Sequence, residues 1–229
     1  MKKTPIIISL GGSLIVPKTG IDVSFLKTFK TFIAKRVSQG ERFVLICGGG
    51  STARQYQKAA KEVGRISRED VDWIGIHSTR LNAHLLRTVF QNLAHAAVIK
   101  NPHAPPRFRE SVLIAAGWKP GWSTDYCATL LASSLGATTV LNLSDVDYVY
   151  SADPRKDPKA VALPKLNWKT FRKMIGNRWD PGANVPFDPV AAKLAERLGL
   201  TVKMIKGRAL GDIAKALDGK SFTGTVIAD

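Results

Sequence analysis

Cysteine is scarce in this 229-residue sequence, and long apolar runs are missing. The two cysteines, Cys47 and Cys127, lie far apart outside any CxxC pair, which argues against a disulfide framework or a cysteine-based zinc site. We expect both to be small buried hydrophobic residues. The apolar run at residues 6–10 is too short for a signal peptide, so we expect a cytoplasmic protein without a membrane partner.

Several familiar site motifs are missing as well. The four histidines form no HExxH pattern, so we expect no metal held by the protein's own side chains. No GxGxxG follows the first apolar run, which argues against a dinucleotide-binding turn. Gly219-Lys220-Ser221 resembles the end of a P-loop, but Ala214 stands where that motif requires glycine.

Acidic residues are few. Against 34 lysines and arginines there are 18 aspartates and glutamates, which gives a net charge of +16. The positive electrostatic potential of such a chain attracts polyanions, including nucleotides, nucleic acids and anionic membranes. The basic residues are spread along the chain, so a solvated basic surface is the favoured interpretation and we do not expect nucleic acid as a partner.

The sequence does contain a regular alternation of β-branched runs and amphipathic helical runs. Residues 5–10 are typical of a buried strand, and Phe25 and Phe29 begin a repeat at helical spacing. Ser51 or Thr52 is expected to cap the helix that follows the triple glycine. This order predicts a single α/β domain with a mostly parallel sheet and helices on both faces. We expect strands at 5–10, 42–47, 96–99, 112–115, 140–143, 201–205 and 223–227, helices near 25–37, 52–63, 68–86, 124–135, 189–198 and 213–217, and irregular chain at 145–164.

Three glycine-rich turns follow expected strands: Gly11-Gly12-Ser13, Gly48-Gly49-Gly50, and residues 117–125. Ligands of open α/β sheets bind at the carboxyl ends of the strands. Glycine there lets backbone N–H groups approach an anion, and the dipole of the following helix favours negative charge. Arg54 lies one turn into the helix after the second turn. Together these features predict a ligand with several phosphate groups.

Several segments, in this order, resemble the signatures of the amino acid kinase superfamily. They are IIISLGGS at 6–13, CGGG at 47–50 with Arg54, GWSTD at 121–125, SDVDYVYSADPRKDP at 144–158 and FDP at 187–189. Within the superfamily the chain is most similar to archaeal-type uridylate kinases, to which DWIGIHSTRLNA at 72–83 points. The resemblance spans residue 6 to about residue 227.

This resemblance implies a three-layer α/β/α kinase that transfers the γ-phosphoryl group of ATP to UMP, giving UDP and ADP in pyrimidine nucleotide synthesis. It implies a homohexamer whose chain forms one domain over residues 1–229. The N-terminal lobe of that domain would bind the acceptor, and the C-terminal lobe would bind ATP with Mg²⁺.

Carried over by position, the resemblance also implies site residues. The implied ATP site comprises Gly11, Gly12, Ser13, Ser144, Asp145, Tyr150 and Asp153. The implied UMP site comprises Gly49, Gly50, Arg54, Asp72, Gly121, Trp122, Ser123 and Thr124. Of these, Asp72 would bind the ribose hydroxyls, the turn from Gly117 to Thr124 would enclose the uridine, and Arg54, Gly12 and Gly49 would serve the transfer itself.

The chemistry of the implied reaction requires positioning and charge neutralisation. The UMP phosphate is already ionised near neutral pH, so no general base is needed. Mg²⁺ held mainly by phosphates and water needs no carboxylate cage. Ser9 stands where many superfamily members have lysine, which leaves Lys119, Lys156 and Lys206 as alternative sources of a catalytic cation.

The chain departs from the family pattern at two further places. Tyr148 replaces a usual glycine, and its ring could fill part of the adenine pocket. Trp118 and Trp122 replace smaller residues or histidine, and they could either stack on a base or pack against a neighbouring subunit. Ser9 and Tyr148 also motivate an alternative function, a nucleotide-binding or oxyanion-storage relative without transfer. A sibling kinase for another small acid or phosphate acceptor is a further alternative.

Overall fold

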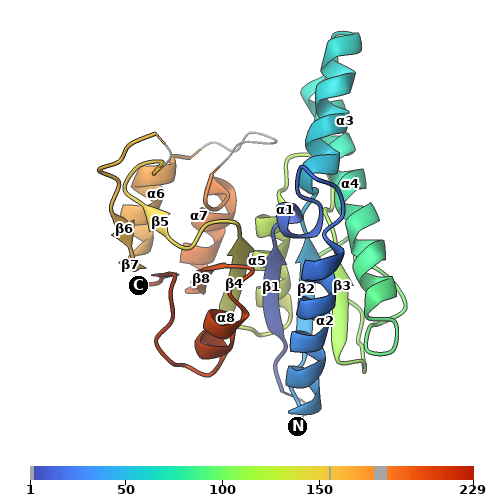
Figure 1. Cartoon of the computed structure of the whole chain (residues 1–229), viewed down its shortest axis with the longest axis vertical. Coiled ribbons are helices and arrows are strands. Elements are labelled where there is room, and N and C mark those ends of the chain that lie inside the picture. The colour runs from blue at the N-terminus through green and yellow to red at the C-terminus, as the bar shows by residue number, and fades with distance from the viewer. Residues whose placement is uncertain (1–2, 155, 178–184) are drawn as a thin grey trace.

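A seven-stranded sheet forms the middle layer of the molecule (Figure 1). The computed structural model describes residues 3–154, 156–177 and 185–229. The strand order is β3 (Val112–Ala115), β2 (Phe43–Cys47), β1 (Ile6–Leu10), β4 (Thr139–Ser144), β8 (Thr201–Lys206), β9 (Thr225–Ile227) and β7 (Lys165–Leu166). A separate hairpin pairs β5 (Val149–Tyr150) with β6 (Ala162–Leu163). The expected three-layer, mostly parallel α/β fold is confirmed.

Strands β3, β2, β1, β4 and β8 run parallel, and β9 pairs antiparallel with β8. Strand β2 is buried along its whole length, which explains its unbroken apolar sequence. In the register of the sheet, Leu10 of β1 lies opposite Cys47 of β2 and Leu143 of β4. Three strands therefore end at the same level, and the turns that follow them emerge side by side.

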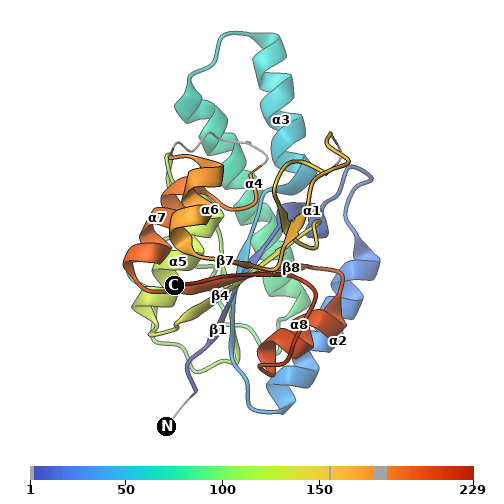
Figure 2. The same cartoon turned by 90° about the vertical axis from the view of Figure 1, so that its left-hand side faces the viewer.

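Helices cover both faces of the sheet (Figure 2). One core cluster joins the sheet to α1 (Gly12–Ile15), α2 (Val23–Ser38), α4 (Arg68–Val89) and α8 (Leu210–Leu217). The other joins it to α5 (Thr124–Ser134), α6 (Trp168–Ile175) and α7 (Pro189–Arg197). Both cysteines are free and buried, as expected. Within the described chain, no helix is long and apolar enough to cross a membrane.

Side-chain caps fix the starts of most long helices. Asp22, Ser67, Ser123 and Asp188 each accept a backbone N–H from the first turn of α2, α4, α5 and α7, respectively. Serine and aspartate are among the residue types favoured at helix N-caps.

Helix α3 (Gly50–Val63) starts differently from the expectation. Its N-cap is Gly49 and its first residue is Gly50, with φ of +67°, so the expected cap at Ser51 or Thr52 is wrong. The hydroxyl of Ser51 instead donates to the carbonyl oxygen of Pro17 at 2.7 Å. The first amides of α3 are therefore capped by none of the described side chains.

Some elements differ from the sequence-based expectation. Residues 96–99 form no strand. Ile99 makes a single bridge to Ala115, and Ala94, just before the segment, makes one to Val112. The segment expected to be irregular, 145–164, contains the β5–β6 hairpin. Helices α1 and α6 and strand β7 were not expected from the sequence.

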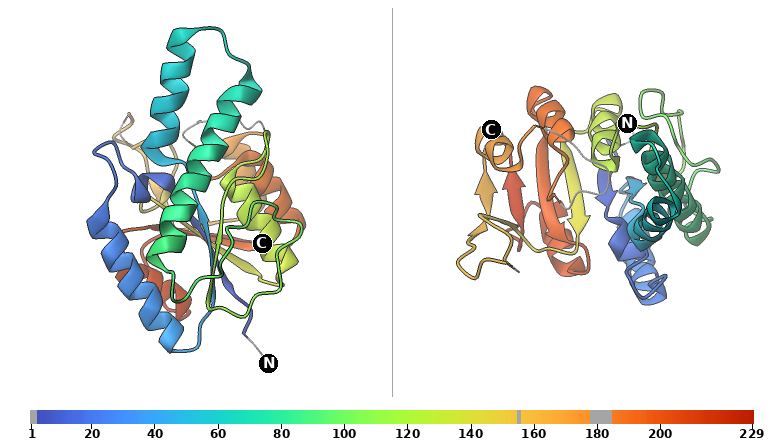
Figure 3. Two further views of the ribbon diagram at one scale, coloured as in Figure 1. Left: turned by 90° about the vertical axis from the view of Figure 1, so that its right-hand side faces the viewer. Right: turned by 90° about the horizontal axis from the view of Figure 1, so that it is seen from above.

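The hairpin of α3 and α4 projects beyond the rest of the molecule (Figure 3). The residues that α3 buries, Gly50, Ser51 and Ala53, all lie in its first turn. Further along, Tyr56 is 66% exposed and Val63 is 91% exposed. The outer part of this hairpin thus presents apolar side chains to its surroundings.

Candidate active site

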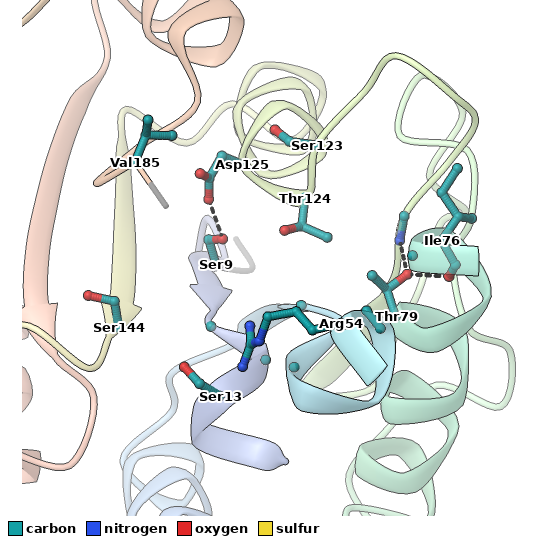
Figure 4. Close-up of a pocket in the computed structure, with 18 of the residues that line it drawn as sticks. Ser9, Ser13, Arg54, Ile76, Thr79, Ser123, Thr124, Asp125, Ser144 and Val185 are labelled. Atoms are coloured by element: carbon teal, nitrogen blue, oxygen red, sulfur yellow. Dashed lines mark hydrogen bonds between the residues drawn. The ribbon is translucent and has the colours of Figure 1, made fainter. Parts of the chain in front are cut away.

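A cavity of about 320 Å³ opens at the carboxyl ends of β1, β2 and β4 (Figure 4). Ser144 and Val185 lie on one side of it, and Ile76 and Thr79 lie on the other. It adjoins all three glycine-rich turns that the sequence singles out. The structure thus brings together, at one edge of the sheet, turns that are more than a hundred residues apart in the chain.

Most of the residues expected to bind ligand line this cavity. They are Gly11, Gly12, Ser13, Gly49, Gly50, Arg54, Asp72, Trp122, Ser123, Thr124 and Ser144. Gly121 lies next to the cavity, where its N–H donates to Asp72 Oδ2 at 2.7 Å. Asp145, Tyr150 and Asp153 are not among the described residues that line it.

The first two glycine turns interlock. A Cβ atom on Gly12 would lie 2.0 Å from the backbone nitrogen of Gly50, and one on Gly50 would lie 2.5 Å from Gly12 O. The N–H of Gly48 donates to Leu10 O at 2.9 Å, which extends the β1–β2 ladder into the turns. Only glycine fits at these positions, and the packed backbones direct the first turns of α1 and α3 at the cavity.

Arg54 supplies positive charge to the cavity. Its side chain extends from α3, one turn after the start of the helix, toward Ser13 (Figure 4). Among the described residues it is the one lysine or arginine that lines the cavity. The other expected sources of a cation lie outside that lining: Lys119 has its Nζ 4.2 Å from the ring centroid of Trp118, Lys206 ends β8 opposite Ser144, and Lys156 is exposed.

A buried carboxylate, that of Asp125, lines the cavity. Asp125 Oδ1 accepts hydrogen bonds from Ser9 Oγ at 2.8 Å and from Asn142 Nδ2 at 2.9 Å. Its Oδ2 accepts the backbone N–H of Asp188 at 3.2 Å. Burial raises the pKa of Asp125 to about 6, and the nearby Asp188 carboxyl adds to this, while the hydrogen bonds to Ser9 and Asn142 oppose it.

Asp188 links this carboxylate to the third glycine-rich turn. Its Oδ1 caps α7 by accepting the N–H of Val190, and its Oδ2 accepts the hydroxyl of Ser123, the N-cap of α5. Burial raises the pKa of Asp188 as well. The starts of α5 and α7 are thereby joined at the cavity by side-chain hydrogen bonds.

The expected site residues did not include Asp125, Asn142 or Asp188. Both aspartates stand in quoted motifs, GWSTD and FDP. Asp188 precedes a proline as helix caps do, and Asp125 lies in the first turn after the cap Ser123. Asn142 had a weaker signal, a single amide within the apolar strand β4. These three side chains meet only because of the order of the strands in the sheet, and that order cannot be deduced from any single segment of the sequence.

Residues 117–123, hereafter the acceptor turn, pack along α4. Gly117 N–H donates to Thr79 Oγ1 at 2.8 Å, and the same hydroxyl donates to Ile76 O at 2.6 Å. At the other end of the turn Asp72 holds the N–H of Gly121. Burial raises the pKa of Asp72, and the hydrogen bond from Gly121 opposes that rise.

One aromatic side chain, Trp122, lines the cavity, and two further rings pack around it. The ring centroid of Trp122, which lines the cavity, is 4.1 Å from that of Tyr126 and 6.2 Å from that of Trp118. Trp118 packs against the core cluster on the α5 face. Within the chain the two tryptophans thus stack with each other, and Trp122 borders the space that a ligand would occupy.

The segment after β4 contains a further pair of aromatic rings. Tyr150 donates its hydroxyl hydrogen to Asp147 Oδ1 at 2.8 Å, and Tyr148 meets the Tyr150 ring edge-on at 6.3 Å between centroids. Tyr148, the departure from the family pattern, therefore packs against a tyrosine of its own segment.

The donor set does not form a protein cage for a metal ion. Within the described ranges, no three His, Cys, Asp or Glu side chains gather as ligands would. The two carboxylates that line the cavity, Asp72 and Asp125, already accept hydrogen bonds from protein groups. A site with these side chains fits a divalent cation that is coordinated mainly by phosphate oxygens and water.

The chain is similar to known kinases over its whole length. The model of the amino acid kinase family matches residues 4–206. The uridylate kinase of Methanocorpusculum labreanum is 33% identical over 229 residues, covering 99% of this chain and 96% of that protein. The uridylate kinase of Methanoculleus marisnigri is 34% identical over 232 residues, covering 100% of this chain and 97% of that protein. The crystal structure of uridylate kinase from Archaeoglobus fulgidus has a TM-score of 0.83 and 34% identity, covering 98% of this chain and 100% of that one.

The interlocked glycines give a stability prediction. Gly12→Ala places a methyl group against backbone atoms that cannot rotate away, so we expect it to lower the free energy of unfolding by about 3 kcal/mol or more. Gly211→Ala, in α8 with no atom within 4 Å of its Cβ, is the matched control and should be neutral or stabilising by up to about 1 kcal/mol. Urea denaturation measures both; equal stabilities of Gly12→Ala and the wild type would contradict the interlock.

Asp125 gives a pH prediction. The native state holds its proton up to about pH 6, whereas the unfolded chain releases it near pH 4, so its contribution to stability is complete below about pH 4. As the pH rises through this window, the free energy of unfolding should fall by on the order of 3 kcal/mol from this group.

Denaturation at several pH values between 4 and 7 tests this for the wild type and for Asp125→Asn. The variant keeps an oxygen that can accept from Ser9 and Asn142 but does not titrate. Its stability should therefore vary less across the window. Identical pH dependence of the two proteins would refute the assignment.

Proposed function

The chain belongs to the amino acid kinase family, and we propose that it is a UMP kinase, transferring the γ-phosphoryl group of ATP to UMP to give UDP and ADP. The observation that carries this proposal is the cavity in which two interlocked glycine turns and Arg54 meet. Full-length similarity to proteins named uridylate kinase supports the choice of acceptor.

UMP would occupy the side of the cavity between α3, α4 and the acceptor turn. Gly49, Gly50 and Arg54 would bind its phosphate, because unobstructed amides at a helix start and a guanidinium both favour an anion. Asp72, whose Oδ2 accepts the N–H of Gly121, would bind the ribose hydroxyls through Oδ1. Trp122 and Thr124, which line the same side, would border the uracil ring.

ATP would occupy the other side, over the ends of β1 and β4. Gly11, Gly12 and Ser13 would bind its phosphates, and Ser144, at the end of β4, would lie near the adenosine. Asp145, Tyr150 and Asp153 belong to the segment that follows β4 and would flank the adenosine from there. In this proposal the single domain has an N-terminal acceptor lobe and a C-terminal ATP lobe.

Positioning and charge neutralisation would provide the rate. The acceptor phosphate is ionised near neutral pH, so the protein needs to hold the two substrates in line rather than remove a proton. Amides of Gly12 and Gly49 and the guanidinium of Arg54 would face the oxygens of the transferred group, whose charge is spread in the transition state. Lys206, Lys119 and Lys156 stay candidates for a second cation, and of these Lys206 ends the strand next to Ser144.

We propose Mg²⁺ as the ion that accompanies ATP. When bound, it neutralises charge on the phosphate oxygens. The hydroxyl groups of Ser13, Thr124 and Ser144, which line the cavity, would hold its water shell, since both nearby carboxylates already have donors. Asp125 would act on the site by fixing β1, β4 and the start of α7 relative to one another.

The alternatives have less support. An oxyanion-storage or nucleotide-binding relative without transfer is not favoured, because the similar proteins from three archaea are named uridylate kinase. A sibling kinase for another small acid is disfavoured on the same ground. We further propose that the enzyme acts in the cytoplasm, in pyrimidine nucleotide synthesis, where ATP and UMP are both present.

Release of ADP with a panel of acceptors tests the proposal. With ATP and Mg²⁺, UMP should be turned over in preference to CMP, acetylglutamate and carbamate, and UDP should form in equal amount to ADP. Absence of UDP formation, with ADP released only for another acceptor, would contradict UMP as the substrate.

Arg54→Ala separates chemistry from scaffold in the same assay. Removing a guanidinium from the transferred group should lower kcat by about a hundredfold or more. The melting temperature should stay nearly unchanged because Arg54 is exposed. A large loss of thermal stability would mean that Arg54 is structural.

We also propose that the chain forms a homohexamer, supported by the exposed apolar residues of the projecting hairpin. Leu81 on α4 is 64% exposed, like Tyr56 on α3. Leu81→Glu should reduce the mass measured by light scattering, because it places a charge in a subunit contact. Val161→Glu, at a 61% exposed position outside the hairpin, is the control. A monomeric wild type would contradict the hexamer.

A further inference from the structure

Arg80 of α4 donates hydrogen bonds to backbone carbonyl groups of the acceptor turn. Arg80 Nη2 donates to Trp118 O at 2.7 Å, and Nε is 3.4 Å from Gly117 O. Its guanidinium carbon lies 5.7 Å from the ring centroid of Trp73, which is two turns earlier on the same side of α4. A planar guanidinium can donate to two adjacent carbonyls at once, which an ammonium group cannot do with the same geometry.

Three side chains of α4 now account for the hydrogen bonds between this helix and the acceptor turn. Asp72 and Thr79 are seven residues apart, about two turns or 10 Å, so they lie on the same side of α4. Asp72 accepts a hydrogen bond from the N–H of Gly121, and Thr79 accepts one from the N–H of Gly117. Arg80 holds the carbonyls between them. A seven-residue segment without regular structure is thus fixed to a helix at both ends and in between.

The same helix holds the second glycine turn. Asn82 Nδ2 donates to Gly48 O at 2.8 Å, and Asn82 is buried. Arg80 and Asn82 lie on opposite flanks of the line through Asp72 and Thr79, so α4 contacts the acceptor turn on one flank and the turn before Arg54 on the other. The distance between these two turns is therefore set by one rigid element.

We propose that Arg80 is a positioning residue for the acceptor: by holding the carbonyls of Gly117 and Trp118, it fixes the acceptor turn at the right distance from the second glycine turn. Arg80 does not line the cavity, and it acts through the backbone of the turn without touching the nucleotide. This inference rests on the proposed function for the identity of the acceptor, a nucleoside monophosphate. It assigns control of acceptor affinity to a residue outside the binding surface.

Steady-state kinetics of three variants test the proposal. Arg80→Met leaves two carbonyls without their charged donor, so KM for UMP should rise about tenfold while kcat and KM for ATP stay within about twofold. Arg80→Lys should rescue part of the loss, with a rise of about threefold, because an ammonium reaches one carbonyl. Arg87→Met is the matched control on the same helix; among the described residues its Nε has no hydrogen-bond partner, and all parameters should match the wild type.

Hydrogen exchange followed by mass spectrometry provides a readout without substrate. Peptides covering residues 117–123 should exchange faster in Arg80→Met than in the wild type and Arg87→Met. An unchanged KM for UMP in Arg80→Met, or a parallel rise in KM for ATP, would overturn the proposal. If the wild type makes no UDP, the proposed function fails, and the exchange rates alone decide whether Arg80 fixes the turn: unchanged exchange refutes it.

Discussion

The close approach of two backbone turns is the constraint on which the rest of this structure depends. Gly12 and Gly50 leave no room for a side chain between β1 and β2, so the peptide groups of both turns face one cavity. The approach is possible because the parallel strands end in register, with Leu10 opposite Cys47. An anion at this edge would meet backbone amides and helix starts from two segments at once. The catalytic proposal follows from this geometry more than from any one side chain.

Buried polar side chains in and around the cavity keep that geometry. Asp125 joins β1, β4 and the start of α7, while α4 holds the glycine turn and the acceptor turn by separate hydrogen bonds. Burying these groups is favourable only when each finds a partner, so they specify one arrangement of the strands and helices. The hydrogen bonds of Asp125 thus fix the parts of the chain that surround the cavity relative to one another.

The sequence predicted the elements whose signals are local. The apolar run of β1 and the cap-plus-proline start of α7 at Asp188 both have a single physical interpretation, and both are present. The cap at Ser51 failed because its hydroxyl donates to Pro17 O, in a segment distant along the chain. The strand at 96–99 failed because only Ile99 pairs with β3, at Ala115. In the site, the glycine turns were predictable because runs of glycine directly follow apolar strand segments in the sequence. The contacts of Asp125 and Arg80 were not, since they exist only once the strand order is known.

The most direct measurement is a crystal structure with a bisubstrate compound in which uridine and adenosine are joined through a chain of phosphates. The account predicts phosphate oxygens about 3 Å from the backbone nitrogens of the first two glycine turns, with the uridine under the acceptor turn. Phosphates bound elsewhere on the basic surface, with the glycine turns facing only water, would contradict it.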